Sequence, residues 1–158
     1  MTTSDRPRPP ERTPERLSEL LRAATAQLAA AGVPTPDVDA ELLAAHVWGW
    51  SRGELAAAAL RGDDAPVDGR EVLDDLIARR AAREPLQHLT GVAPFRHLEL
   101  RVGPGVFVPR PETETVAQLA IDALRAAAGS APIAVDLGTG SGALALALAT
   151  EVPHARVF

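Results

Sequence analysis

Apolar residues recur every three or four positions along the first half of the chain, which is the spacing of one face of an α-helix. Four such stretches lie within residues 14–83 and are separated by helix start and stop signals. Helix-start signals occur at Thr13-Pro14-Glu15, at Thr35-Pro36-Asp37, and at Ser51 with Glu54, where they fit a capping box. The fourth helix is predicted over residues 68–83. Together these stretches predict a small all-α domain.

The hydrophobic spacing changes after Pro85. Residues 98–102 alternate between apolar and polar side chains, which indicates a half-buried β-strand. Gly103-Pro104-Gly105 has the composition of a turn, and residues 106–108 begin a return strand that ends at a proline. Residues 84–110 are therefore predicted to form a β-hairpin linker.

The last third of the chain, residues 111–158, has the pattern of an α/β domain. A helix is predicted from Pro111 to about Gly129, and its apolar face comprises Val116, Leu119, Ala120, Ala123, Leu124 and Ala127. Residues 133–137 are a short apolar run typical of a buried strand. A glycine loop, a helix over residues 143–150 and the start of a second strand follow. Because these pieces cannot bury both faces of a sheet, we expect the sequence to be the front part of a longer protein.

Composition excludes several classes of function. The 16 basic residues are all arginine, the net charge is −5, and no basic stripe is present, so direct nucleic-acid binding is not expected. The absence of lysine excludes a P-loop or a Schiff base, and the absence of cysteine excludes disulfides and thiolate metal sites. Four scattered histidines do not indicate a metal site. Residues 1–13 are rich in proline and charge and are predicted to form a disordered tail. With no membrane span or secretory signal in the pattern, we expect a soluble cytoplasmic protein.

The glycine loop allows two interpretations. Gly138-x-Gly140-x-x-Ala143 satisfies the dinucleotide-binding pattern. Asp136-x-Gly138-x-Gly140-x-Gly142 is the nucleotide-recognition pattern of S-adenosylmethionine-dependent methyltransferases. A carboxylate two residues before the first glycine opposes a pyrophosphate but suits the ammonium and sulfonium of S-adenosylmethionine. Asp136 therefore favours methyl transfer. Both classes place a ribose-binding acid about 20 residues beyond the first glycine, at or just past Phe158.

A second motif is more specific. It consists of Glu84-Pro85-Leu86-Gln87-His88-Leu89-Thr90-Gly91, then Phe95, then Val106-Phe107-Val108-Pro109-Arg110-Pro111-Glu112-Thr113-Glu114. With the glycine loop downstream, it resembles the linker of the protein-glutamine methyltransferases that modify bacterial peptide chain release factors, the PrmC/HemK family. The resemblance covers about residues 17–158. It implies an α/β fold in which a helical substrate-docking domain and a β-hairpin linker precede an incomplete Rossmann-like methyltransferase domain.

The resemblance also implies an activity and a set of site residues. Enzymes of this family methylate the side-chain amide nitrogen of the glutamine in the Gly-Gly-Gln motif of class I release factors, with S-adenosylmethionine as cofactor. The cofactor-binding residues implied here are Asp136, Gly138, Thr139, Gly140, Ser141 and Gly142. The residues implied near the substrate pocket are Arg110, Pro111, Glu112, Thr113 and Glu114. The family's Asn-Pro-Pro-Tyr motif, whose acceptors aim the amide nitrogen, is expected beyond residue 158. We therefore expect residues 1–158 alone to be inactive.

Three alternatives remain open on the sequence. The chain could belong to another Rossmann-like methyltransferase, to an NAD-dependent oxidoreductase, or to a non-catalytic fragment that binds a partner through its helical domain. The expected assembly is a monomer with release factors as protein partners. Cofactor binding separates these classes, because only methyltransferases should bind S-adenosylhomocysteine in preference to NADH.

Overall fold

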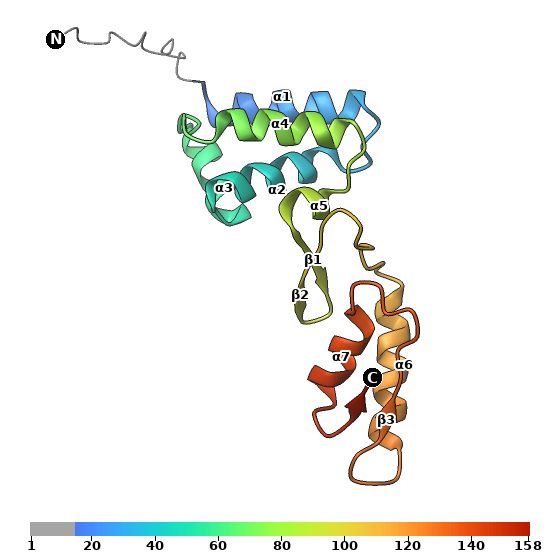
Figure 1. Ribbon diagram of the computed structural model, residues 1–158. Coiled ribbons are helices and arrows are strands. Elements are labelled where there is room, and N and C mark those ends of the chain that lie inside the picture. The colour runs from blue at the N-terminus through green and yellow to red at the C-terminus, as the bar shows by residue number, and fades with distance from the viewer. Residues whose placement is uncertain (1–14) are drawn as a thin grey trace, which may run out of the picture. The chain divides into compact units, whose positions relative to one another are not determined.

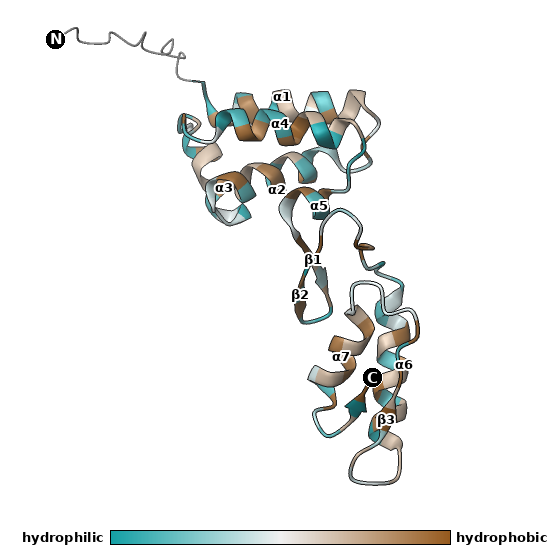
Figure 2. Cartoon of the chain, in the orientation of Figure 1, coloured by the Kyte–Doolittle hydropathy of each residue, from teal (hydrophilic) through white to brown (hydrophobic). Residues whose placement is uncertain are grey.

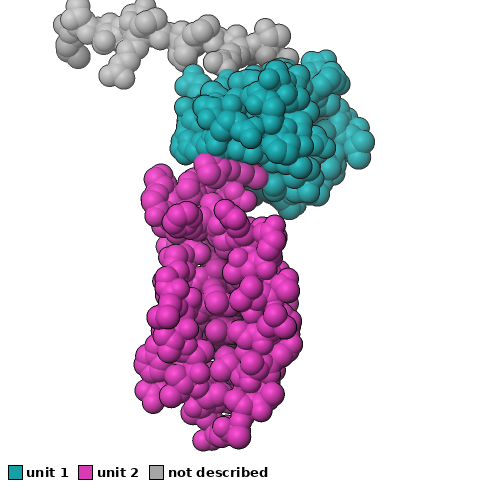
Figure 3. Space-filling view, turned by 90° about the vertical axis from the view of Figure 1, so that its right-hand side faces the viewer, with its two compact units in different colours: residues 1–84 teal, residues 85–158 magenta. Residues whose placement is uncertain are grey.

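The computed structural model describes residues 15–158. The chain divides between Glu84 and Pro85 into two compact units, which Figure 3 colours separately. The tail predicted for residues 1–13 and the cap predicted at Thr13 lie outside the described residues. Among the residues that the structure describes, no helix has both the length and the apolar character needed to cross a lipid bilayer.

The first unit contains the four predicted helices (Figure 1). They are α1 (Leu17–Ala30), α2 (Pro36–Trp48), α3 (Arg52–Arg61) and α4 (Arg70–Ala81). Helix α1 packs against α2, α3 and α4, and α2 also packs against α3 and α4. Apolar and polar residues alternate around these helices (Figure 2), and the buried positions of α1 are Leu17, Leu20, Ala24 and Leu28. The predicted helical organisation of this segment is confirmed.

The helix-start signals predicted at α2 and α3 have different outcomes in the structure. At α3 the predicted capping box is confirmed, because the Ser51 hydroxyl accepts from the Glu54 backbone N–H and the Glu54 carboxylate accepts from the Ser51 N–H. At α2 the Thr35 side chain does not cap the helix. Its hydroxyl instead donates to the carboxylate of the buried Asp39 at 3.0 Å.

The second unit combines short strands with three helices. Its elements are α5 (Leu86–Thr90), β1 (Val92–Phe95), β2 (Leu98–Arg101), α6 (Thr113–Ala126), β3 (Ile133–Ala134), α7 (Ala143–Glu151) and β4 (Arg156–Val157). Strands β1 and β2 pair antiparallel, with Phe95 opposite Leu98. Strands β3 and β4 pair parallel, with Ile133 opposite Arg156, and α7 connects them. The sequence pattern missed α5 and β1.

The predicted hairpin pairs the wrong strands. We expected residues 98–102 to pair with residues 106–108, but β2 pairs with β1, and the turn is formed by Arg96 and His97. Burial explains this outcome. Phe95 and Leu100 are both almost fully buried, whereas Phe107 on the expected return strand is 83% exposed. Pairing β1 with β2 therefore removes more apolar surface from water.

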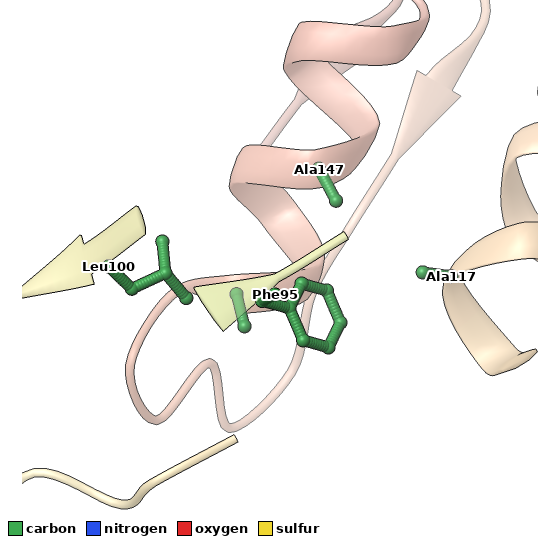
Figure 4. Close-up of a cluster of buried hydrophobic side chains, with 5 residues drawn as sticks. Phe95, Leu100, Ala117 and Ala147 are labelled. Carbon is green, nitrogen blue, oxygen red and sulfur yellow. The ribbon is translucent and has the colours of Figure 1, made fainter. Parts of the chain in front are cut away.

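A cluster of buried side chains joins the β1–β2 hairpin to α6 and α7. Its members are Phe95, Leu100, Ala117, Ala143 and Ala147. The ring of Phe95 extends from β1 toward Ala117 on α6, with Ala147 of α7 nearby (Figure 4). The alanines keep α6 and α7 close enough for their backbones to approach.

The predicted buried face of α6 is largely wrong. The residues that α6 buries are Ala117, Ile121 and Leu124, whereas Val116 and Leu119 are exposed. Only Leu124 belongs to both sets. Ala117 packs where α7 presents Ala143 and Ala147, whereas Ile121 and Leu124 pack against Leu148 of α7.

The strand before the glycine loop is shorter and more exposed than predicted. We expected residues 133–137 to form a buried strand, but β3 includes two residues, and the pairing continues only through the Asp136 N–H, which donates to the Phe158 carbonyl at 2.8 Å. Val135 and Leu137 are exposed. Within residues 15–158 β3 has β4 as its only partner strand, so no described element covers these side chains.

Candidate functional site

A pocket of about 250 Å³ lies in the second unit, between the segment that leads into α6 and the glycine loop that leads into α7. Its lining residues are Phe107, Val108, Pro109, Arg110, Thr113, Asp136, Gly138, Thr139, Gly140, Ser141, Ala143 and Leu144. Both sequence motifs therefore contribute to one cavity, although about 25 residues separate them in the chain.

The pocket includes some of the predicted site residues and leaves out others. Those that line it are Arg110, Thr113, Asp136, Gly138, Thr139, Gly140 and Ser141. Pro111, Glu112, Glu114 and Gly142 do not line it. Gly142 instead forms the N-cap of α7. Phe107 and Val108 also line the pocket and were not among the predicted site residues; their signal in the sequence is their place directly before the Pro-Arg-Pro segment.

The glycine loop depends on backbone conformations that favour glycine. Gly138, Gly140 and Gly142 have φ angles of 77°, 55° and 76°, in the left-handed region that other L-residues rarely adopt. The Gly142 N–H donates to the Thr139 carbonyl at 2.8 Å and closes the turn. A Cβ atom at Gly138 would meet no neighbour within 4 Å. Backbone conformation, rather than space, therefore explains the glycine there.

Asp136 connects the end of β3 to the start of α7. Its Oδ2 accepts a hydrogen bond from the Ala145 backbone N–H at 3.2 Å, so a carboxylate satisfies one of the unpaired donors of the helix N-terminus. The N–H groups of Ala143 and Leu144 have no hydrogen-bond acceptor among residues 15–158. The pocket wall thus presents free backbone donors beside a negative charge.

This arrangement distinguishes between the two interpretations of the loop. A pyrophosphate on the α7 N-terminus would meet the Asp136 carboxylate, which already occupies that end of the helix. An ammonium or sulfonium group would be attracted to the same carboxylate. The electrostatics of the pocket therefore favour a ligand that carries positive charge near Asp136.

Arg110 supplies a positive charge on the opposite wall. Among the described residues its guanidinium forms no ion pair with Glu112 or with Asp136. The exposed Arg110 side chain also borders a second cavity of about 430 Å³. An unpaired guanidinium at a pocket wall can bind a carboxylate with two parallel hydrogen bonds.

The second cavity shares a wall with the first. Phe107, Val108 and Arg110 line both, and Phe107 is 83% exposed. On its other side His88 Nε2 lies 2.9 Å from the Val106 carbonyl oxygen. Since a carbonyl only accepts, this contact requires the proton on Nε2. His88 therefore holds the segment before Phe107 in place.

Glu114 makes its contacts outside the pocket. Its Oε1 accepts from the Arg96 backbone N–H at 3.0 Å. The Arg96 guanidinium donates to both carboxylate oxygens of Glu151, with Nη2 to Oε2 at 2.8 Å. The hydrogen bond from Arg96, with nearby positive charge, holds the pKa of Glu151 below its ordinary value. The sequence pattern gave no signal for this contact.

Among residues 15–158 no three histidine or acidic side chains gather as the ligands of a metal ion would. The groups that can hold a ligand are the loop amides, the Asp136 carboxylate and the Arg110 guanidinium.

Comparison with known proteins finds a matching family model and several similar proteins. Residues 19–91 match the family described as the PrmC N-terminal domain. The chain carries a PrmC N-terminal domain. Proteins named "Release factor glutamine methyltransferase" are similar to it over most of its length. The protein of Streptomyces coelicolor is 60% identical over 141 residues, that of Mycolicibacterium smegmatis 52% over 145, and that of Bifidobacterium longum 45% over 143.

These alignments cover 89–90% of this chain and 48–49% of each relative. The chain therefore spans about half the length of the curated relatives that it matches. Since 141 aligned residues cannot fit within the first 91, the similarity extends beyond the PrmC N-terminal domain into the second unit. The resemblance inferred from the sequence is confirmed.

Proposed function

We propose that this protein methylates the side-chain amide nitrogen of the glutamine in the Gly-Gly-Gln motif of class I peptide chain release factors, with S-adenosylmethionine as methyl donor. The names of its relatives support a role in release factor methylation. Because the chain spans about half of each relative, the activity belongs to a protein of their length. Residues 1–158 contain the docking domain and the front of the donor site.

The second unit is, in this proposal, the start of a Rossmann-like methyltransferase domain. Parallel β3 and β4 joined by α7 form the β-α-β unit with which such domains open. The acid and the glycine loop lie at the carboxyl end of β3, where open α/β sheets bind their ligands. The β1–β2 hairpin precedes this unit as the linker.

One observation carries the proposal: Arg110 and Thr113 line the same pocket as Asp136 and the glycine loop. The resemblance assigns the first pair to the reacting centre and the second group to the donor. If the two motifs belonged to separate sites, they would have no reason to share a cavity. Their meeting supports one site at which donor and acceptor come together.

The groups in the pocket suit S-adenosylmethionine. Asp136 matches its positive charge, the unpaired Arg110 guanidinium matches its carboxylate, and the free N–H groups of Ala143 and Leu144 can bind its polar atoms. The volume of about 250 Å³ is just below the roughly 300–1,000 Å³ of small-molecule sites. These residues therefore form part of the enclosure, and further residues of a longer chain would complete it.

The chemistry requires accurate positioning. An amide nitrogen is a weak nucleophile because its lone pair is delocalised, and the bound donor supplies an electrophilic methyl group. Catalysis then depends on holding the amide nitrogen in line with that methyl group. The residues described here bind and orient the donor. The acceptors that orient the amide belong to the expected Asn-Pro-Pro-Tyr motif, since residues 1–158 contain no asparagine and no tyrosine.

Ligand titration of the 158-residue chain tests the donor site. We expect S-adenosylhomocysteine to shift the amide resonances of Gly138, Gly140 and Gly142, and NADH to leave them unchanged. Asp136→Asn should weaken binding of S-adenosylmethionine, because it removes the negative charge and keeps the side-chain shape. Loop shifts caused by NADH, or by neither ligand, would contradict the assignment.

The activity needs a separate assay. A chain of the relatives' length should add one methyl group to the glutamine of a release factor, detected by mass spectrometry of the Gly-Gly-Gln peptide. A release factor with alanine in place of that glutamine is the control. Methylation at another residue would contradict the proposed glutamine substrate. It would not contradict the proposed donor site.

A further inference from the structure

A polar cluster connects the hairpin to both helices that carry the pocket. We call it the Arg96 cluster; its members are Arg96, Glu114, Gln118 and Glu151. Arg96 lies in the β1–β2 turn, Glu114 and Gln118 lie on α6, and Glu151 is the last residue of α7. The Arg96 and Glu151 side chains are only 12% and 15% exposed. The cluster is therefore a largely buried junction of three elements.

Arg96 donates the hydrogen bonds that join the four members, while Arg125 on α6 also donates to the Glu151 carbonyl at 3.2 Å. The Arg96 backbone N–H donates to Glu114 Oε1 at 3.0 Å, and its Nη2 donates to Gln118 Oε1 at 2.9 Å. Its Nε and Nη2 donate to the two oxygens of Glu151. A planar guanidinium satisfies these directions together, which a lysine ammonium does not. The left-handed backbone of Arg96, with φ 54°, is held by the Glu114 contact.

Each helix in the junction begins at a pocket wall. Helix α6 starts at Thr113 and α7 starts at Ala143, and both of these residues line the pocket. Arg96 does not line it and makes no hydrogen bond to residues 136–142. A change in the relative position of α6 and α7 would nevertheless move the Arg110–Thr113 wall against the glycine loop.

We infer that Arg96 is a positioning residue for the donor site, which it serves by fixing α6 relative to α7. The identity of the ligand in this inference rests on the proposed function. The contacts of Arg96 with α6 and α7 do not depend on it. The resemblance assigns Glu114 to the substrate pocket. In this inference Glu114 has a different role, because its carboxylate accepts the hydrogen bond that holds the Arg96 turn. The effect on ligand binding is indirect, through the spacing of the two walls.

A comparison of hairpin variants tests the inference. Arg96→Met removes the charge and keeps the aliphatic stem, and Arg96→Lys keeps the charge but loses the forked geometry. Arg101→Met is the matched control, because Arg101 lies on the same hairpin, is exposed, and its side chain makes no hydrogen bond or ion pair with the described residues. The measurements are amide chemical shifts of residues 138–142 without ligand and the dissociation constant for S-adenosylhomocysteine.

We expect Arg96→Met to shift the loop amides and to weaken binding about tenfold, since a displaced wall no longer aligns its groups with the ligand. Arg96→Lys should give an intermediate loss, and Arg101→Met should change neither measurement. A purely structural role predicts lower thermal stability in both Arg96 variants with unchanged loop shifts and unchanged affinity. That result would overturn the inference.

Two further outcomes are informative. If the unmodified chain binds no S-adenosylhomocysteine but Arg96→Met still shifts the loop amides, the positioning role stands and the donor assignment fails. If Arg96→Met does not fold, Glu151→Gln carries the same test from the α7 side, because it weakens the paired hydrogen bonds and leaves the hairpin turn intact. Unchanged loop amides in Glu151→Gln would then overturn the inference.

Discussion

Asp39 on α2 and Arg80 on α4 form a buried ion pair, with Asp39 Oδ2 2.7 Å from Arg80 Nε. Their side chains are only 5% and 15% exposed. Thr35 donates to the other Asp39 oxygen, and Arg80 Nη1 donates to the Glu84 carbonyl. Each charged group thus has a hydrogen-bond partner besides the other member of the pair, as buried ions require.

Removing one member of this pair should destabilise the helical unit. Asp39→Ala leaves the Arg80 charge uncompensated, and we expect the free energy of unfolding to fall by about 3 kcal/mol. Urea unfolding followed by tryptophan fluorescence measures this unit alone, because the chain's two tryptophans are Trp48 and Trp50. The control is Glu41→Ala, since Glu41 pairs with Arg52 in a largely exposed position and should cost below about 1 kcal/mol. Equal losses in the two variants would contradict this account.

Two substitutions of Asp136 separate the effect of its hydrogen bond to Ala145 from the effect of its negative charge. Asp136→Ala removes the acceptor for the Ala145 N–H and should cost about 1 kcal/mol, as the loss of a helix cap does. Asp136→Asn keeps a carbonyl acceptor there and should cost less. Hydrogen exchange of the α7 amides measures both effects. If Asn destabilises α7 as much as Ala, charge rather than hydrogen bonding holds this end of the helix.

The pair formed by Arg96 and Glu151 should make the second unit sensitive to acid. Because the pKa of Glu151 is held below its ordinary value in the folded chain, its stabilising contribution is complete at neutral pH and is lost as the pH falls through the folded-state pKa. Glu151→Gln should therefore be less stable than the parent at neutral pH, and this difference should shrink below about pH 4. Amide exchange of β1, α6 and α7 across a pH series measures it. A difference that stays constant down to about pH 3 would contradict the assignment to Glu151.

The exposed apolar side chains around β3 and β4 should bind hydrophobic probes. Leu137 is 88% exposed, and Val135 and Phe158 are also exposed; large exposed apolar side chains can bind apolar partners. We expect the chain to enhance the fluorescence of anilinonaphthalene sulfonate, and Leu137→Ser to reduce that signal without loss of stability. Thr115→Ser, at an exposed position on α6, is the control. An unchanged signal in Leu137→Ser would place the probe elsewhere.

The helical unit could be predicted from the sequence because its signals are local. Ser51 and Glu54 define a capping box by themselves, and the buried residues of α1 follow the helical period. The glycine loop was predictable for the same reason, since alternate glycines after an acid specify a sharp turn without help from distant residues.

The hairpin and the α6 face could not be predicted, because distant contacts decide both. Gly103-Pro104-Gly105 has the composition of a turn, yet the chain turns at Arg96, where Glu114 holds a left-handed backbone that no glycine marks. Ala117 is buried because α7 presents small residues to it. The pocket itself was predictable as a pair of motifs, but which residues face it depends on how α6 and α7 pack.

The order of contacts along the chain has a consequence for biosynthesis. The packing of α1 to α4, including the pair of Asp39 with Arg80, uses no residue beyond Glu84, so a nascent chain holds all of these partners once Glu84 has left the ribosomal exit tunnel. The pairing of Ile133 with Arg156 becomes possible only after α7 has been translated. The helical unit can therefore fold while the second unit is still being made.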